Sequence, residues 1–383
     1  MTLRSIVTAG VYASLVPILG ATGTWTGSMS AAPVAELQAP ASDTQADIPV
    51  HGGRLERRNA ARGLQPAVDA IVRADQGPAW IAWSVPAVSR RDDDHGDWGD
   101  KGSARCVLDD DGEFHDWHGM RGNLTVLVVL ARASHGAIDR LAFADRRCTI
   151  EAGARPIYWL DGVVPAESVR LLDALIRREA ASGRTDDDDR GKHDRMGKRA
   201  LPALALHEAP EADRALTQYV AAGNPQWLRR DAAFWVGATR GSTGAPIIDR
   251  LARTDPDDSF REHLTFVLTL MGEPGITTLL ELAKHDASTG VRGQALFWLG
   301  QKAGQRATAA LGDAVNNDPD SDVRKRAVFA ISQLPRDQSV PKLIDLAKTH
   351  RDPEVRKQAM FWLGQSGDAR AVSFFESVLK GGI

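Results

Sequence analysis

The chain has 383 residues, of which 43% are hydrophobic, and its formal net charge is −3. It is long enough for two domains and has the composition of an ordinary globular protein. From Arg190 onward there are 27 Lys and Arg against 23 Asp and Glu, a net charge of +4, which leaves −7 for the first half. Because nucleic-acid binding usually demands a strongly basic surface, we expect no nucleic-acid partner.

Residues 1–30 have the layout of a secretory signal peptide. A single positive charge at Arg4 precedes a mostly apolar, uncharged stretch at residues 5–22, and small residues come after it. Pro17 and several Gly and Ser make this stretch too weak for a membrane span. We therefore expect a periplasmic or secreted protein with no integral membrane segment in the mature chain; a disordered extension is the alternative. Residues 31–52, rich in Ala and Pro, are expected to be a disordered linker.

The two cysteines, Cys106 and Cys148, lie in the part that would be exported. An even number of cysteines in an oxidising compartment favours a disulfide between them. Two buried free thiols are the alternative. Neither cysteine belongs to a C-x-x-C pair, so the pattern does not favour a redox or zinc-ribbon site.

Residues 53–162 are expected to form a small α+β domain with an antiparallel sheet. Apolar residues at helical spacing around Pro66 predict a first helix. Strands are predicted at residues 78–88 and 103–108, and the pattern of residues 124–133 and 137–144 indicates a hairpin. Residues 148–151 and 157–160 add two short strands.

Two polar loops, residues 90–102 and 109–122, separate these strands. Their potential metal ligands are Asp92, Asp94, His95, His115 and His118. Neither loop has the spacing of a calcium-binding loop, and His115-x-x-His118 lacks a third spaced ligand, so solvated loops or a partner-binding patch of the loop aromatics remain open. We assign no catalytic residue, no metal and no cofactor.

Residues 163–189 are expected to be a capping helix followed by an acidic loop. Apolar residues share one face of the segment 165–181, with Glu167 near its start and Arg177 and Arg178 near its end, as an amphipathic helix requires. The acidic run at residues 185–192 indicates a solvated loop. The helix would cover the first unit of the C-terminal half of the chain.

Residues 190–383 repeat a ten-residue phrase, most complete from Val355 to Gly364, at spacings of 32, 32, 31, 32 and 32 residues. A fixed period of this length indicates stacked supersecondary units. Each unit has a cap, a helix with a central alanine such as Ala359, and a second helix. The sequence therefore predicts an all-α solenoid of about six helical hairpins.

The motif D-P-x-V-R-x-x-A-x-x-x-L-G with this period resembles HEAT repeats, in the compact bacterial form also called PBS-lyase HEAT-like. The resemblance implies a right-handed superhelix in a family of mostly interaction scaffolds, with a minority of bilin lyases and DNA glycosylases. It also implies an Asp/Arg ladder between adjacent turns. The arginines are Arg229, Arg261, Arg292, Arg324 and Arg356, and we pair them with Asp257, Asp320 and Asp352, one turn earlier.

This sequence departs from the average HEAT pattern by placing Phe at one position in five units, with Trp beside it in three. We favour large rings that fill the seams between repeats; an exposed aromatic stripe for a partner is the alternative. The phenylalanines are Phe234, Phe266, Phe297, Phe329 and Phe361, and the tryptophans are Trp235, Trp298 and Trp362.

The expected function is an exported, non-enzymatic scaffold that binds a protein or peptide in a groove lined by the second helices. Candidate contact residues there are mixed in sign, which suits a protein surface. A bilin-lyase-like activity, implied by the resemblance alone, or a metal-dependent enzyme using the loops of residues 90–122 is the alternative. The candidate contact residues are Arg250, Arg253, Glu281, Lys284, Lys342, Asp345 and Glu376.

Overall fold

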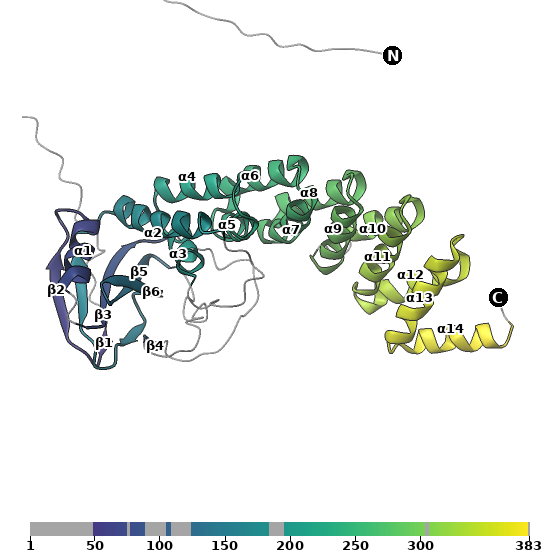
Figure 1. Ribbon diagram of the computed structural model, residues 1–383. Coiled ribbons are helices and arrows are strands. Elements are labelled where there is room, and N and C mark those ends of the chain that lie inside the picture. Colours follow the sequence, from purple (N-terminus) through teal and green to yellow (C-terminus); the bar gives the residue numbers. More distant parts are fainter. Residues whose placement is uncertain are drawn as a thin grey trace, which may run out of the picture. The chain divides into compact units, whose positions relative to one another are not determined.

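The structure is a computed structural model that describes residues 49–74, 77–88, 105–108, 124–183, 195–302 and 306–381. Small mixed sheets come first, and a helical repeat region comes after them (Figure 1). The predicted signal peptide and most of the linker lie outside the described residues, as do the polar loops and the acidic run.

The main sheet has five strands in the order β2-β8-β3-β5-β6. The predicted hairpin is present, since β5 (Val126–Ser134) pairs antiparallel with β6 (Ala137–Asp145) and with β3 (Ala79–Pro86). However, β8 (Ile157–Asp161) runs parallel to both β3 and β2 (Leu55–Asn59). The sheet is therefore mixed rather than antiparallel, because β8 lies between β2 and β3 and runs in the same direction as both.

A second, three-stranded sheet is parallel and has the order β1-β7-β4. Its strands are β1 (Val50–His51), β7 (Thr149–Glu151) and β4 (Arg105–Val107). The expectation that residues 31–52 form a linker is thus wrong at its end, because Val50 and His51 pair with Ile150 and Glu151. These backbone hydrogen bonds need no hydrophobic pattern, so composition alone did not indicate them.

Both faces of the five-stranded sheet are buried. Side chains alternate along each strand and therefore point in turn into two different cores. From β3, Ile81 and Trp83 face a core shared with α1 (Leu64–Ala74) and α2 (Pro165–Ala180). Trp80 and Ala82 face the opposite core, which includes residues of the three-stranded sheet. The predicted capping helix corresponds to α2, and Pro165 occupies its first turn.

The sheet and the first repeat share one continuous core. Helix α3 (Met196–Ala205) packs against α2 and β6. The end of β3 is also hydrogen-bonded to the repeat region. The Val88 N–H donates to the Leu206 carbonyl, and the Glu208 N–H donates to the Pro86 carbonyl. The first repeat is therefore fixed to the sheet by backbone hydrogen bonds as well as by apolar packing.

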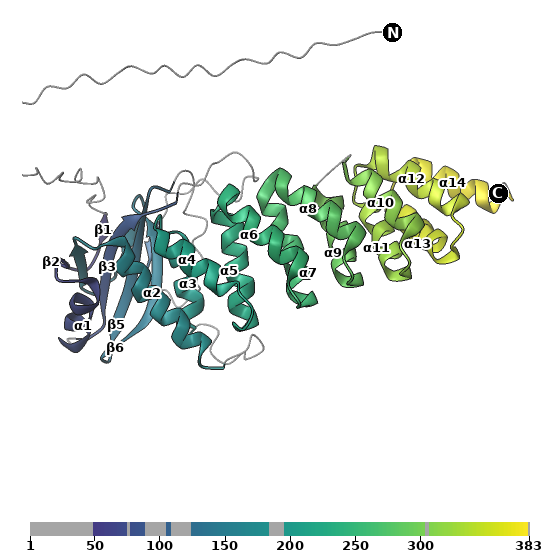
Figure 2. The same ribbon diagram turned by 90° about the horizontal axis from the view of Figure 1, so that it is seen from above.

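Six helical hairpins form the repeat region, with first and second helices in two layers (Figure 2). Asp257, Asp320 and Asp352 cap first helices by accepting hydrogen bonds from backbone N–H groups, as expected. The hairpins are α3 with α4 (Pro210–Tyr219), α5 (Gln226–Thr239) with α6 (Gly241–Thr254), α7 (Asp258–Leu268) with α8 (Gly272–His285), α9 (Thr289–Lys302) with α10 (Ala307–Asn317), α11 (Ser321–Ser332) with α12 (Arg336–Thr349), and α13 (Pro353–Gln365) with α14 (Ala369–Leu379).

Within the described residues, one stretch, Asp258–His285, is long and apolar enough to cross a membrane. By itself this is weak evidence, because 56% of its most apolar window is buried inside the protein. The stretch is also not one straight helix: α7 continues into a short 3-10 turn, Thr269–Met271, and Gly272, the first residue of α8, adopts φ 60°. We assign it to the core of the third hairpin.

Candidate functional site

Four of the five arginines of the repeat motif each join two repeats. Arg292 donates from Nη1 to the carbonyls of Asp286 and Ala287 in the loop before its own helix. Its Nε and Nη2 donate to both carboxylate oxygens of Asp318 in the next repeat, at 2.8 and 3.0 Å. This two-pronged geometry is the strongest arrangement available to an Arg and a carboxylate. The hydrogen bonds that Arg292 donates to Asp318 raise the pKa of Arg292.

The same arrangement recurs along the array and corrects the predicted pairing. The carboxylate partners lie in the following repeat: Arg229 pairs with Asp255, and Arg261 with Asp286. Asp257 and Asp320, which we paired with the arginines, serve mainly as helix caps. Asp352 does both, because it caps α13 and accepts from Arg324 at 2.7 Å. The Arg324 hydrogen bond holds the Asp352 pKa below its ordinary value.

Eight aromatic rings on the first helices form a continuous ladder. Phe234 stacks on Phe266 with centroids 6.3 Å apart, and Phe297 stacks on Phe329 at 5.9 Å. Tilted contacts of 5.1 Å between Phe266 and Trp298, and of 4.8 Å between Phe329 and Trp362, complete the series. The rings do fill the seams between repeats, but most remain half-buried, and Phe361 is 53% exposed.

The seven predicted contact residues lie on second helices, as expected from the repeat. Six are exposed and Lys342 is half-buried. Helix α6 contacts α8, α8 contacts α10, and α12 contacts α14, so these faces succeed one another along the layer of second helices. The residues are Arg250 and Arg253 on α6, Glu281 and Lys284 on α8, Lys342 and Asp345 on α12, and Glu376 on α14.

The side chains of this second-helix face make only weak local contacts. Arg253 pairs with Asp249 at 2.9 Å, and Glu376 lies 3.9 Å from Lys380. Ion pairs this exposed contribute little to stability because water screens them. The charged groups therefore remain able to exchange their present partners for groups on another molecule.

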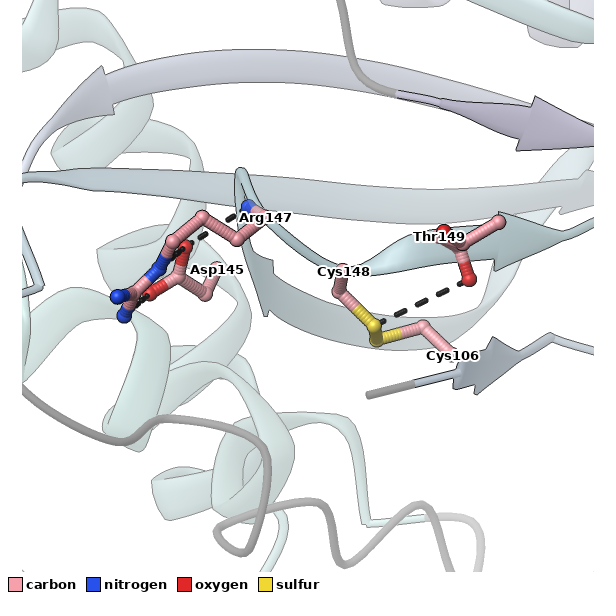
Figure 3. Close-up of a disulfide and its surroundings, with 5 residues drawn as sticks. All are labelled: Cys106, Asp145, Arg147, Cys148 and Thr149. Atoms are coloured by element: carbon pink, nitrogen blue, oxygen red, sulfur yellow. Dashed lines mark hydrogen bonds and ion pairs between the residues drawn. A yellow bond between two sulfur atoms is a disulfide. The ribbon is translucent and has the colours of Figure 1, made fainter. Parts of the chain in front are cut away.

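The predicted disulfide is present between Cys106 and Cys148, with their Cα atoms 6.0 Å apart (Figure 3). It joins β4 to the start of β7 across the second core. Beside it, Arg147 donates to both carboxylate oxygens of Asp145, and the Cys148 N–H donates to the Asp145 carbonyl. These bonds fix the turn after β6 and so place Cys148 opposite Cys106.

A buried hydrogen-bond chain connects the sheet, α2 and the first repeat. The Trp83 indole N–H donates to Ser168 Oγ at 2.8 Å, and Ser168 Oγ lies 2.8 Å from His207 Nε2. His207 Nδ1 lies 2.7 Å from the Ala203 carbonyl and therefore carries the ring proton. Burial lowers the His207 pKa to about 4. Since all three side chains are fully buried, we interpret this Ser and His pair as structural rather than nucleophilic.

The candidate metal ligands Asp92, Asp94, His95, His115 and His118 lie outside the described residues. Among the residues that the structure does describe, no group of three or more His, Cys, Asp or Glu is arranged to hold a metal ion.

A small cavity between α1 and the sheet, lined in part by Arg58, Ser134 and Tyr158, has a volume of ≈ 20 Å³. That is room for about one water molecule.

The repeat family matches over most of the helical array. The sequence model of the HEAT-repeat family matches residues 244–332, 276–349 and 308–381. The helical hairpins within residues 244–381 are HEAT repeats. The match begins within α6 and ends after α14, so it leaves the sheets and the first helices of the array uncovered. No curated protein matches the sequence.

Several solved structures show a distant similarity to the chain. The phycocyanin lyase complex of CpcE and CpcF from Nostoc sp. PCC7120 is 17% identical, with a TM-score of 0.32, over 43% of this chain and 97% of that one. Human deoxyhypusine hydroxylase is 16% identical, with a TM-score of 0.26, over 55% and 90%. The S. pombe condensin Cnd3-Cnd2 subcomplex is 16% identical, with a TM-score of 0.32, over 53% and 28%. Similarity at this level carries no argument about function.

Proposed function

We propose that the protein is an exported, non-enzymatic scaffold that binds a protein or peptide along its second-helix face. The observation that carries this proposal is the exposure of charged side chains of both signs on successive second helices of a HEAT array. Such a face offers many shallow contacts that add up over its length. The disulfide supports export, because bridges of this kind persist in oxidising compartments.

The partner is to be identified by photo-crosslinking in cells. A photoreactive residue at Lys284 of α8 should capture a partner from the envelope fraction, whereas the same residue at Lys302, exposed at the end of first helix α9, should not. Capture at both positions, or only at Lys302, would contradict the assignment of the binding face.

The captured partner then allows a titration. The combined variant Arg250→Glu, Arg253→Glu, Glu281→Lys and Lys284→Glu should weaken binding at least about 100-fold, and each single reversal less than about tenfold, because the contacts are distributed. Lys302→Glu with Lys357→Glu, two exposed changes on first helices, serves as the matched control. If one His or Asp substitution between residues 92 and 118 removed activity while the combined variant was silent, the function would belong to the N-terminal loops.

A further inference from the structure

The ends of the second helices carry a row of cations. One position, in or directly after the last turn, holds a basic residue in four of five successive repeats and an amide in the fifth. All five side chains are exposed. The members of this basic row are Arg253, Lys284, Asn316, Lys348 and Lys380, which are 31 or 32 residues apart.

An arginine from elsewhere in the chain occupies the place of the uncharged member. Arg351, which follows α12 and is exposed, donates from Nη2 to the Asn316 carbonyl at 2.8 Å. This hydrogen bond also ties the end of α10 to the end of α12. The basic row therefore carries positive charge at every helix from α6 to α14.

The nearest carboxylates in the sequence do not neutralise the basic row. Asp255, Asp286 and Asp318 come directly after α6, α8 and α10. Their side chains are buried, and each pairs with an arginine of a first helix. The arginine ladder thus takes up these negative charges, and the basic row stays cationic.

A second row, of opposite sign, lies one turn earlier on three of these helices. Three residues before the basic row, α8, α10 and α12 each present an exposed carboxylate. Residues three apart lie on the same side of a helix, so the two rows run side by side. The same position holds Arg250 in α6 and Ser377 in α14, which limits the acidic row to the middle of the array. Its members are Glu281, Asp313 and Asp345.

The charges of the two rows are largely unpaired. Lys284, Asp313 and Asp345 form no ion pair with any described residue. The Lys348 ammonium contacts only an aromatic ring, that of Phe374, at 5.6 Å from its centroid. Both rows are therefore available to the charged groups of another molecule.

The spacing of the rows sets the kind of segment that can pair with both. Packed helices lie about 8–10 Å apart, so charges of one sign recur at about that interval along the array. An α-helix advances about 10.5 Å in seven residues and returns to nearly the same side. An extended strand covers this distance in about three residues, which places successive charges on opposite faces. A helix matches the rows and a strand does not.

We propose that the partner of the second-helix face, whose existence rests on the function proposed above, presents an α-helix that lies across α8, α10 and α12. One flank of this helix carries carboxylates at seven-residue intervals, which pair with the basic row. The other flank carries Lys or Arg at the same interval, which pair with the acidic row. Mixed flanks would bring like charges together and are disfavoured.

Two synthetic peptides test this arrangement. Both contain four heptads of Ala and Gln with one Glu and one Lys per heptad, on the two flanks of one helix face. In the segregated peptide every Glu lies on one flank and every Lys on the other, whereas in the mixed peptide they exchange places in alternate heptads. Composition and net charge are identical. In a titration at low ionic strength, the full chain should bind the segregated peptide at least about tenfold more tightly than the mixed one.

A variant that exchanges the two rows should invert this preference. Glu281→Lys with Lys284→Glu, combined with Asp345→Lys and Lys348→Glu, reverses both rows on α8 and α12 and keeps the net charge. The rows then alternate in sign from helix to helix, so the variant should bind the mixed peptide more tightly. Glu354→Lys with Lys357→Glu is the matched control, since it exchanges two exposed charges three residues apart on first helix α13. The control should keep the original preference.

Equal affinities for the two peptides, or no measurable binding of the segregated one, would overturn the helical partner. A row-exchanged variant that still prefers the segregated peptide, or a control that loses the preference, would do the same. Photo-crosslinking at Lys284 separates this proposal from the scaffold function. Capture there together with equal peptide affinities would leave the scaffold standing and overturn only the helix, whereas absence of capture would contradict the scaffold itself.

Discussion

Arg292 illustrates how a single side chain can bind two HEAT repeats together. It satisfies loop carbonyls in its own repeat and both oxygens of Asp318 in the next, and both side chains are more than nine-tenths buried. Removing the cation would leave the buried Asp318 carboxylate without its partner. That loss is more serious than the loss of the pair itself, because an unpaired buried charge is poorly solvated.

Arg292→Met, which keeps much of the apolar stem, should therefore lower the free energy of unfolding by about 3–5 kcal/mol. Arg306→Met is the control, since Arg306 and its partner Glu273 are both exposed, and we expect no resolvable change in its unfolding midpoint. Urea denaturation followed by circular dichroism checks both variants. Equal midpoints for the two would mean that the arginine ladder contributes no more than a surface ion pair.

The arginines themselves were predictable from the repeat, but their partners were not. We chose the aspartates nearest in sequence, and the structure uses Asp255, Asp286 and Asp318, which lie 25 or 26 residues downstream of their arginines. A contact between successive repeats has no local spacing pattern. The recurrence of Asp at these three repeat positions was the available signal. At the same position of the next repeat the residue is His350, so Arg324 pairs with Asp352 instead.

At the level of elements, the contact of β3, α2 and the first HEAT repeat depends on a polar chain inside an apolar core. Trp83, Ser168 and His207 come from these three elements, and Ser168 bonds to both of the other side chains. His207 must remain neutral there, because its Nε2 accepts from the Ser168 hydroxyl. Burial lowers its pKa to about 4, and the positive charge of Arg240 acts in the same direction.

Acid should therefore loosen this junction. The folded-state pKa of His207 lies below the unfolded value of about 6.5, so its contribution is complete above that pH and is lost as the pH falls toward 4. The loss amounts to roughly 3 kcal/mol. His207→Gln should flatten the decline in stability between pH 6.5 and 4, and exposed His285→Gln should not. An unchanged slope in His207→Gln would refute this account.

Elements with strong periodicity were predicted well, and the exceptions have physical causes. β2 was missed because its sequence, Leu55-Glu-Arg-Arg-Asn59, is polar and it lies at the sheet edge, where backbone pairing with β8 suffices. The second helices α6 and α12 begin five residues before Pro246 and Pro341, so these prolines lie inside the helices rather than in their first turns. A proline removes only one helical hydrogen bond, which packing of the preceding turn offsets.

For the whole molecule, the disulfide links the fold to a compartment. It closes a loop with a sequence separation of 42 residues across the second core. In the chain-entropy model a loop of this size stabilises the folded state by roughly 4 kcal/mol. A reducing cytosol would withhold that stabilisation, so the bridge supports the proposed export.

Protein isolated from the cell envelope should therefore begin between residues 21 and 33 and react with thiol reagents only after reduction. Intact-mass measurement with and without reductant checks both points. The Cys106→Ser, Cys148→Ser double variant is the control for reagent specificity. An intact Met1 together with two reactive thiols would contradict export and the bridge.

The repeats that begin with α7, α9 and α11 carry both halves of the ladder, an arginine facing forward and an aspartate facing back, so this part of the array is modular in length. An in-frame loss of residues 286–317, one period, would bring Asp318 to the place of Asp286 and give Arg261 a carboxylate again. A tandem duplication of the same segment would leave every ionic rung matched. Evolution could thus lengthen or shorten this protein by whole units without creating an orphan charge inside it.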